Sequence, residues 1–88
     1  MNSEQIKKFV ETKVTLKNKY VKIEFSKRDP VYGIFITDAD YHDLSAKNFW
    51  RIVTSKNFDN YNKTKDVNLA RIFNGSEFSK LSLLSEEF

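Results

Sequence analysis

The 88-residue sequence contains no cysteine, one histidine, one proline and two glycines. The absence of cysteine excludes a disulfide scaffold, a thiolate zinc site and a thiol nucleophile. One histidine gives little support to a nucleophilic triad, and close carboxylates alone do not establish acid–base catalysis. We therefore expect a protein that is not an enzyme and that carries no cofactor.

Long apolar stretches are also missing, because the longest uninterrupted one is the six-residue stretch 31–36. A membrane-spanning helix needs about 20 apolar residues. The first residues, Met-Asn-Ser-Glu-Gln, lack the apolar core of a secretory signal. We expect a cytoplasmic protein with no membrane partner.

The net charge of +3 is the sum of blocks of opposite sign. Residues 1–28 carry eight Lys/Arg against three Glu, and residues 29–48 carry four Asp against one Lys. Residues 49–80 carry six basic and three acidic side chains, and two Glu follow in residues 81–88. Basic regions therefore surround an acidic stretch, which matters more for the choice of partner than the small net charge.

A helix is predicted over residues 3–13. Asn2 or Ser3 can cap it, and Glu4 lies in the first turn, where the helix dipole favours negative charge. Apolar residues then recur every three or four positions, as on one face of an amphipathic helix.

Five short strands are predicted after this helix, and the domain is expected to span residues 1–88. The first, near residues 20–26, shows the two-residue alternation of a strand covered on one face. Residues 31–37 are apolar on both faces, as in a central strand, and Gly33 indicates a bend or bulge. The remaining strands are expected at residues 49–54, 67–73 and 77–84.

Polar segments join these strands. Residues 27–30 form an expected turn ending in Pro30, residues 38–48 are polar and acidic, and residues 55–66 are expected to be a long loop. Asn74 and Gly75, between two apolar runs, predict a tight hairpin turn. Residues 85–88 are expected to be a tail.

These elements predict a mainly β fold with an N-terminal helix. The expected architecture is a small, closed, five-stranded antiparallel barrel with the helix over one open end. The aromatic core is expected to contain Phe35, Phe49, Trp50, Phe73 and Phe78, with the Trp50 N–H bonded to a nearby acceptor.

Two segments resemble the motifs of the Sm-like family, which includes the Sm, Lsm and Hfq proteins. Residues 20–38 give an alternating strand, a turn, and a strand that has a Gly near its start and an Asp at its end. Residues 70–83 give a strand, a turn ending in Gly, and a final strand. A helix followed by five strands is also the order of that family, and SH3-like barrels share the strand order closely.

The Sm-like resemblance implies RNA binding and a homo-oligomer formed through strand edges, which suits a domain of this marginal size. It places RNA contacts in the loop after the second strand and in the turn before the fifth. The corresponding residues are Asp40, Tyr41, His42, Asp43, Asn74, Gly75 and Ser76. Because Asp side chains repel phosphate, contacts with bases are favoured there.

A second candidate for RNA binding mixes cations with aromatic rings over residues 56–65. Phe58 and Tyr61 offer rings for base stacking, while Lys63 and Lys65, like Lys56, offer phosphate contacts. The alternative interpretation is a solvated loop. The lysines of residues 7–22 form another basic cluster, or the solvent face of the helix.

Asp38, Asp40, His42 and Asp43 could hold a divalent cation through carboxylate and imidazole groups. Asp side chains that cap backbone amides at a turn explain the same pattern, and we favour that interpretation. No metal site is therefore predicted.

Two hypotheses follow. The first is an Sm-like barrel that self-associates and binds RNA without catalysis. The second is an SH3-like module for protein interaction or assembly with no nucleic-acid role.

Overall fold

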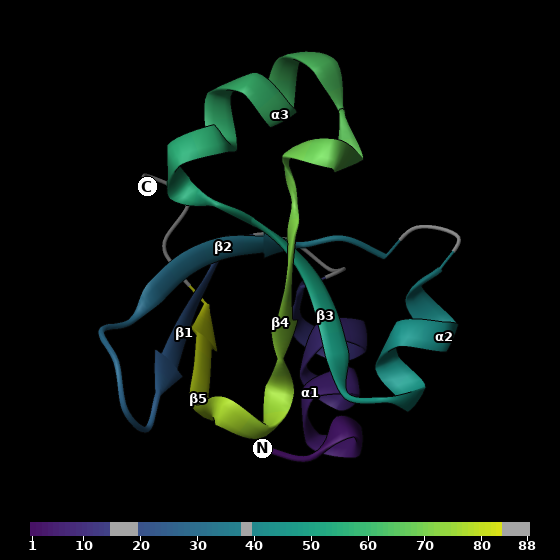
Figure 1. Ribbon diagram of the computed structural model, residues 1–88, viewed down its shortest axis with the longest axis vertical. Coiled ribbons are helices and arrows are strands. Elements are labelled where there is room, and N and C mark those ends of the chain that lie inside the picture. The colour runs from purple at the N-terminus through teal and green to yellow at the C-terminus, as the bar shows by residue number, and fades with distance from the viewer. Residues whose placement is uncertain (15–19, 38–39, 84–88) are drawn as a thin grey trace.

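A five-stranded antiparallel sheet forms the centre of the computed structural model, which describes residues 1–14, 20–37 and 40–83 (Figure 1). The strands lie in the order β4-β3-β2-β1-β5. Their bounds are β1 (Tyr20–Phe25), β2 (Val31–Phe35), β3 (Phe49–Thr54), β4 (Arg71–Asn74) and β5 (Phe78–Leu83). The prediction of five antiparallel strands, with residues 31–37 in a central position, is confirmed.

The sheet is not closed, so the prediction of a closed barrel is wrong. β4 pairs with β3, and β5 pairs with β1. No register joins β4 to β5 in the described part of the chain. The two outer strands are therefore free edges on either side of a gap.

The predicted N-terminal helix is confirmed as α1 (Ser3–Phe9), which continues as a wider π-helical segment, η1 (Val10–Val14). Asn2 caps it, because its side chain accepts a hydrogen bond from the Gln5 N–H and the Gln5 side chain accepts one from the Asn2 N–H. Ile6 and Val10 lie four residues apart and are fully buried. Such side chains contribute about 1.5–3 kcal/mol each to stability.

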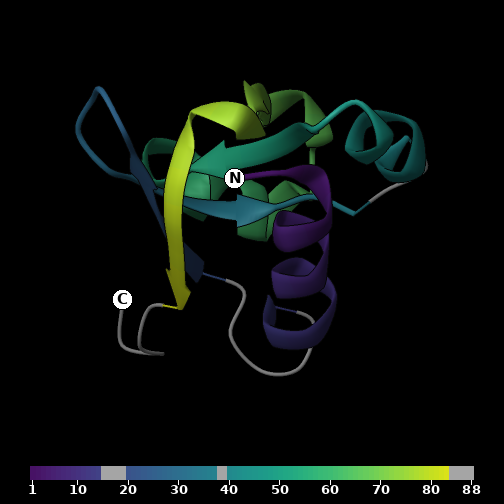
Figure 2. The same cartoon turned by 90° about the horizontal axis from the view of Figure 1, so that it is seen from below.

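Two apolar clusters lie on the two faces of the sheet. α1 packs Ile6 and Val10 onto the first cluster, which contains Val21, Ile23 and Trp50 among others (Figure 2). The second cluster contains Ile34, Ile36, Val53 and Phe58. Alternation along β2 and β3 supplies both faces.

Two further helices lie in segments for which the sequence predicted none. α2 (Tyr41–Ala46) forms in the acidic stretch, and α3 (Phe58–Thr64) replaces most of the expected loop at 55–66. Phe58 and Tyr61, three residues apart, share one face of α3, and burial of Phe58 in the second cluster holds the helix on the sheet. This tertiary burial outweighs the polar composition of the segment.

The predicted hairpin at Asn74 and Gly75 is wrong. A 3₁₀ turn, η4 (Gly75–Glu77), leads from β4 to β5, and the Asn74 side chain caps this turn by accepting from the Ser76 N–H. A tight Asn-Gly hairpin turn requires positive φ at both residues, and neither has it. β5 can therefore turn away from β4 and pair with β1.

Two smaller predictions also need correction. The expected fourth strand at 67–73 is a 3₁₀ turn, η3 (Val67–Leu69), followed by β4. The ladder irregularity lies between Glu24 and Phe25, not at Gly33. At Gly33 the requirement is space, since a Cβ would collide with the Ile52 side chain.

The aromatic core agrees with prediction at Phe35, Trp50 and Phe78, which are buried. Phe73 is only half-buried, and Phe49 is 37% exposed, so the prediction for Phe49 is wrong. Phe49 begins β3, where it pairs with Asn74 at the end of the edge strand β4. The predicted tail at 85–88 lies outside the described residues.

Asn48 joins α2, β3 and η4. Its φ of 62° is in the left-handed region, and its backbone oxygen accepts from the Gly75 N–H at 2.8 Å. Its side-chain oxygen accepts from the Trp50 indole N–H at 2.8 Å, and its side-chain amide donates to the Met1 carbonyl at 3.1 Å. A Cβ at Gly75 would lie 2.6 Å from the Trp50 nitrogen, so the junction requires glycine there.

Asn48→Ala should lower the free energy of unfolding by about 1–3 kcal/mol, because the buried Trp50 N–H loses its acceptor. Asn48→Gly, which tolerates positive φ, should be destabilised for the same reason, whereas the exposed Asn68→Ala should remain close to wild type. Urea denaturation followed by circular dichroism measures all three variants. Equal stability of Asn48→Ala and Asn68→Ala would contradict the role of the junction.

Candidate functional site

The predicted RNA-contacting residues lie near opposite ends of the sheet. α2 and η4, which carry Asp40 to Asp43 and Asn74 to Ser76, lie toward the lower end in Figure 1, and α3 lies at the upper end. The hydrogen bond from Gly75 N–H to the Asn48 carbonyl connects η4 to the end of α2. The structure therefore joins η4 to the segment after α2, although no contact links residues 40–43 to residues 74–76 within the described part of the chain, and both segments lie apart from α3.

The α2 residues are largely engaged in structural contacts. Asp40 forms an ion pair with Arg51 on β3. Tyr41 is buried against the Trp50 ring, and its hydroxyl donates to a Glu11 carboxylate oxygen at 3.1 Å. Burial, and then the hydrogen bond to Glu11, raises the pKa of Tyr41 well above its usual value. His42 and Asp43 are exposed.

In η4, Asn74 and Ser76 are exposed, while Gly75 is buried against Trp50 and Ile6. The Asn74 side-chain oxygen accepts from both the backbone N–H and the hydroxyl of Ser76. The Asn74 side-chain oxygen and the Ser76 donors are thus already hydrogen-bonded to each other within the turn, which leaves few polar groups there to bind a ligand.

On α3, the two rings differ in accessibility. Phe58 is 7% exposed and packs on Tyr20, with a distance of 4.9 Å between ring centroids, so it is not accessible for base stacking. Tyr61 is half-buried, and the Lys65 ammonium lies 5.3 Å from its ring centroid. Lys63 is exposed. The exposed charged groups of α3 and its C-cap are therefore Asp59, Lys63 and Lys65, one carboxylate and two cations.

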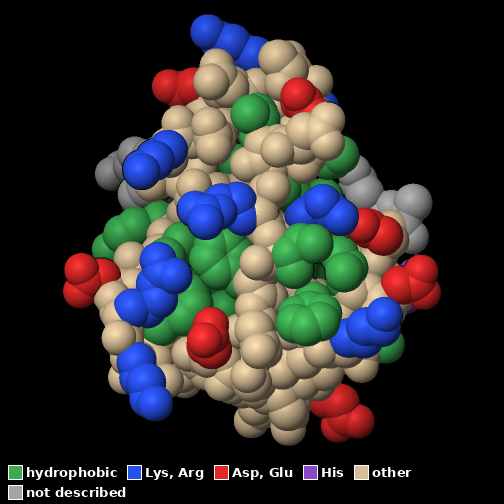
Figure 3. Space-filling view, viewed as in Figure 1, with side chains coloured by type: hydrophobic (Ala, Val, Ile, Leu, Met, Phe, Trp, Pro, Cys, Tyr) green, Lys and Arg blue, Asp and Glu red, His purple; other side chains and the backbone are tan. Residues whose placement is uncertain are grey.

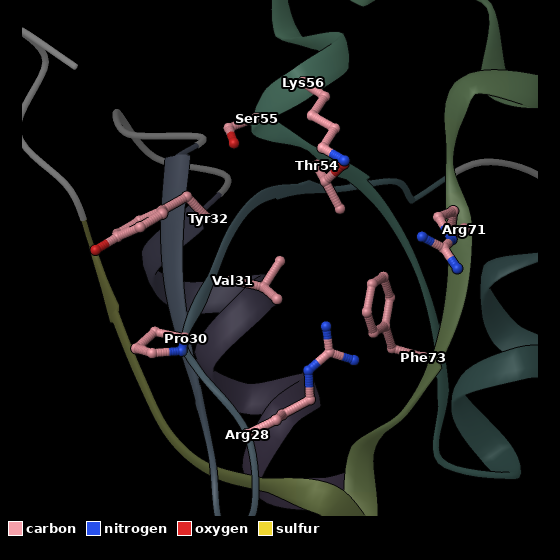
Figure 4. Close-up of a pocket in the computed structure, with 9 residues that line it drawn as sticks. All are labelled: Arg28, Pro30, Val31, Tyr32, Thr54, Ser55, Lys56, Arg71 and Phe73. Atoms are coloured by element: carbon pink, nitrogen blue, oxygen red, sulfur yellow. The ribbon is translucent and has the colours of Figure 1, made fainter.

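A cavity of about 220 Å³ lies beside β4, next to the gap in the sheet (Figure 4). Its lining comes from the loop after β1, the start of β2, the end of β3 with the following turn η2 (Ser55–Asn57), and β4. The lining residues are Arg28, Pro30, Val31, Tyr32, Thr54, Ser55, Lys56, Arg71 and Phe73. In Figure 4 the guanidinium groups of Arg28 and Arg71 extend toward the space in front of Val31 and Phe73.

Three cations and no carboxylate line this cavity. Within the described residues, none of Arg28, Lys56 and Arg71 forms a salt bridge. Arg28 lies over the Phe25 ring, with its Cζ 5.0 Å from the ring centroid, and this contact favours a position of the exposed side chain beside the cavity. All three residues are exposed, and together they give this surface a positive potential that favours an anion.

The surface around the cavity alternates between charged and apolar groups. Lysine and arginine side chains border hydrophobic side chains on this face of the molecule (Figure 3). A second cavity of about 250 Å³ adjoins it at Arg28 and is also lined by Phe25, Ser26, Lys27 and Glu77. Because Glu77 offsets some of its positive charge, the first cavity is the better anion site.

Arg28 and Arg71 were not predicted as site residues, whereas Lys56 lies in the basic and aromatic segment at residues 56–65 that was predicted. Strand alternation contained the signal for Arg71, because Arg71 and Phe73 are two residues apart and point to the same face of β4. Their partners on β3 are Ile52 and Trp50, which are buried. The register therefore places Arg71, which is exposed, beside the apolar cluster at the edge of the sheet.

Within the described residues, no group of three His, Cys, Asp or Glu side chains could hold a metal ion. Asp38, one of the four residues considered for a cation site, lies outside the described part of the chain. None of the helices over residues 1–14, 20–37 and 40–83 reaches the length and apolarity needed to cross a bilayer.

Comparisons of the chain with protein-family models, curated proteins and solved structures gave no match. The geometry and charge of the cavity are therefore the features of the molecule that bear on its function.

Proposed function

We propose that this protein is a non-catalytic binding module that holds single-stranded RNA at the cavity of Arg28, Lys56 and Arg71. The observation that carries the proposal is the set of three cations without salt bridges, among the described residues, around an apolar and aromatic wall. RNA supplies phosphates for the cations and unpaired bases for ring contacts. A cytoplasmic location accords with the absence of cysteine.

The proposal moves the RNA contact away from Asp40 to Asp43. Carboxylates there repel the phosphate backbone, and the Tyr41 ring is buried. Lys63 on α3 and Lys65 at its C-cap follow the turn carrying Lys56 and offer further phosphate contacts, although Asp59 and Asp66 lie in the same segment. We place the RNA path from the cavity toward α3.

The fold supports the same proposal at the level of family. An N-terminal helix and five antiparallel strands are expected for an Sm-like protein, and on this proposal the chain is an open variant of the Sm-like or SH3-like barrel with α2 and α3 inserted before and after β3. The open gap puts the cations of β4 beside those of the loop after β1.

Replacing Arg28, Lys56 and Arg71 together with Gln should weaken binding of a fluorescent 12-nucleotide oligouridine at least tenfold at low salt. It should also flatten the dependence of log K on log salt, because each lost phosphate contact reduces the slope by about 0.7 on single strands. Fluorescence anisotropy across a salt series measures both effects.

The matched control replaces Lys8, Lys47 and Lys80, which are exposed and lie outside the cavity, with Gln. It removes the same charge and should bind nearly as the wild type does. Equal losses of RNA affinity in the two triple variants would show a general effect of charge and would contradict a defined site at the cavity. A wild-type protein that binds no RNA at low salt would refute the proposal, leaving protein interaction as the function.

Self-association through strand edges is the second part of the proposal. β4 and β5 each have one edge without a partner strand in the described chain, and Ile72 on β4 and Leu83 on β5 are 52% and 37% exposed. Such edges readily pair with another chain. We propose that β4 of one copy pairs with β5 of the next.

Light scattering on a sizing column should give a mass that is a multiple of 10.4 kDa. Ile72→Lys combined with Leu83→Lys should return the protein to a monomer, because charged edges resist pairing, while the control Asn68→Lys should keep the wild-type mass. A wild-type monomer at high concentration would exclude the edge-paired assembly and would leave RNA binding to be judged separately.

A further inference from the structure

We infer that the cavity recognises a terminal phosphomonoester, and that its preferred ligand is a phosphorylated end of single-stranded RNA and not an internal phosphodiester. The inference rests on the proposed function and concerns the same three cations. It specifies which part of the RNA enters the cavity.

Charge matching is the first argument. An internal phosphodiester carries one negative charge, whereas a phosphomonoester carries about −1.5 to −2 near pH 7. Arg28, Lys56 and Arg71 contribute three positive charges to one cavity, and no carboxylate in the lining offsets them. A dianion gains more from this cluster than a monoanion does.

The directions of the donors are the second argument. Arg28 comes from the loop after β1, Lys56 from η2 and Arg71 from β4, so the donors belong to three separate walls. Figure 4 shows these three side chains around one space. A terminal phosphate presents three free oxygens to such a cluster, whereas an internal phosphodiester presents two. Arginine is also suited to paired hydrogen bonds with phosphate oxygens.

Size is the third argument. The cavity has a volume of about 220 Å³ and opens to solvent on one side. This space suits a phosphate with part of one nucleotide. An end of the chain can occupy it while the rest of the RNA leaves toward α3.

The apolar wall provides the contact next to the phosphate. Phe73 lies two residues after Arg71 on the same strand face, and Pro30, Val31 and Tyr32 lie across the cavity from β4 (Figure 4). The Phe73 ring is half-buried and lies 6.2 Å, between centroids, from Phe25, which supports it from behind the cavity. A terminal sugar or base can pack against this ring.

The test compares 10-nucleotide oligouridines with a 5′-phosphate, a 3′-phosphate or two hydroxyl ends, each labelled with fluorescein at an end without phosphate. Anisotropy should show at least fivefold tighter binding for one or both phosphorylated oligomers than for the hydroxyl-ended one. The two phosphorylated oligomers identify which end enters the cavity.

Arg71→Gln and Lys56→Gln should each reduce this preference to less than twofold, whereas the exposed Lys80→Gln should retain it. The ratio of affinities is the readout, because a variant that only loses general attraction to RNA weakens all oligomers equally. Circular dichroism confirms that the variants remain folded.

Equal binding of all three oligomers by the wild type would overturn the inference and leave the proposed RNA binding intact. No binding of any oligomer and none of uridine monophosphate would overturn both. A free nucleotide also carries a phosphomonoester, and calorimetric titration with uridine monophosphate tests this second source. Its binding without any oligomer binding would support phosphomonoester recognition and refute the nucleic-acid role.

Discussion

The path of the chain through Gly75 determines the architecture. Gly75 packs against Trp50 and Asn48, and the 3₁₀ turn that it starts separates β4 from β5. β4 stays on β3 while β5 crosses to β1, so the two outer strands do not pair within the described chain. A type I′ hairpin at this position would have joined them as neighbours. The open sheet therefore follows from a close contact between Gly75 and the buried indole.

The open sheet leaves cations beside the gap. Arg71 lies on the inward face of β4, where its ladder partner Ile52 is fully buried, and Arg28 lies over Phe25 at the end of β1. Lys56 completes the cluster from the turn after β3. The adjacent pair of Arg51 and Asp40 on the other face shows the alternative arrangement, in which a carboxylate neutralises the cation. No carboxylate lines the cavity, so its cations lack such a partner within the described residues.

Local periodicity was sufficient to predict much of the fold. The spacing of Ile6 and Val10 located α1, and the alternation of Val21, Ile23 and Phe25 located β1. α3 could not be predicted, because its stability depends on the burial of Phe58 under Ile34 and Val53, which are distant in sequence. The tight hairpin predicted at Asn74 and Gly75 was wrong for a similar reason, because the conformation there depends on Asn48 and Trp50, which are distant in sequence and surround Gly75. The cavity is lined by four segments that are separate in the sequence, so local patterns could not predict it as a whole. Only Arg71 could be recognised locally, through its alternation with Phe73.

The central claim is that the cationic cavity, and not the α2 segment, receives RNA. Amide chemical shifts of the isotope-labelled protein during titration with a 10-nucleotide oligouridine test it most directly. The account predicts the largest changes at Arg28, Ser55, Lys56, Arg71 and Phe73, with small changes at His42 and Asp43. Changes concentrated at residues 40–43 or 74–76, with none around the cavity, would contradict it.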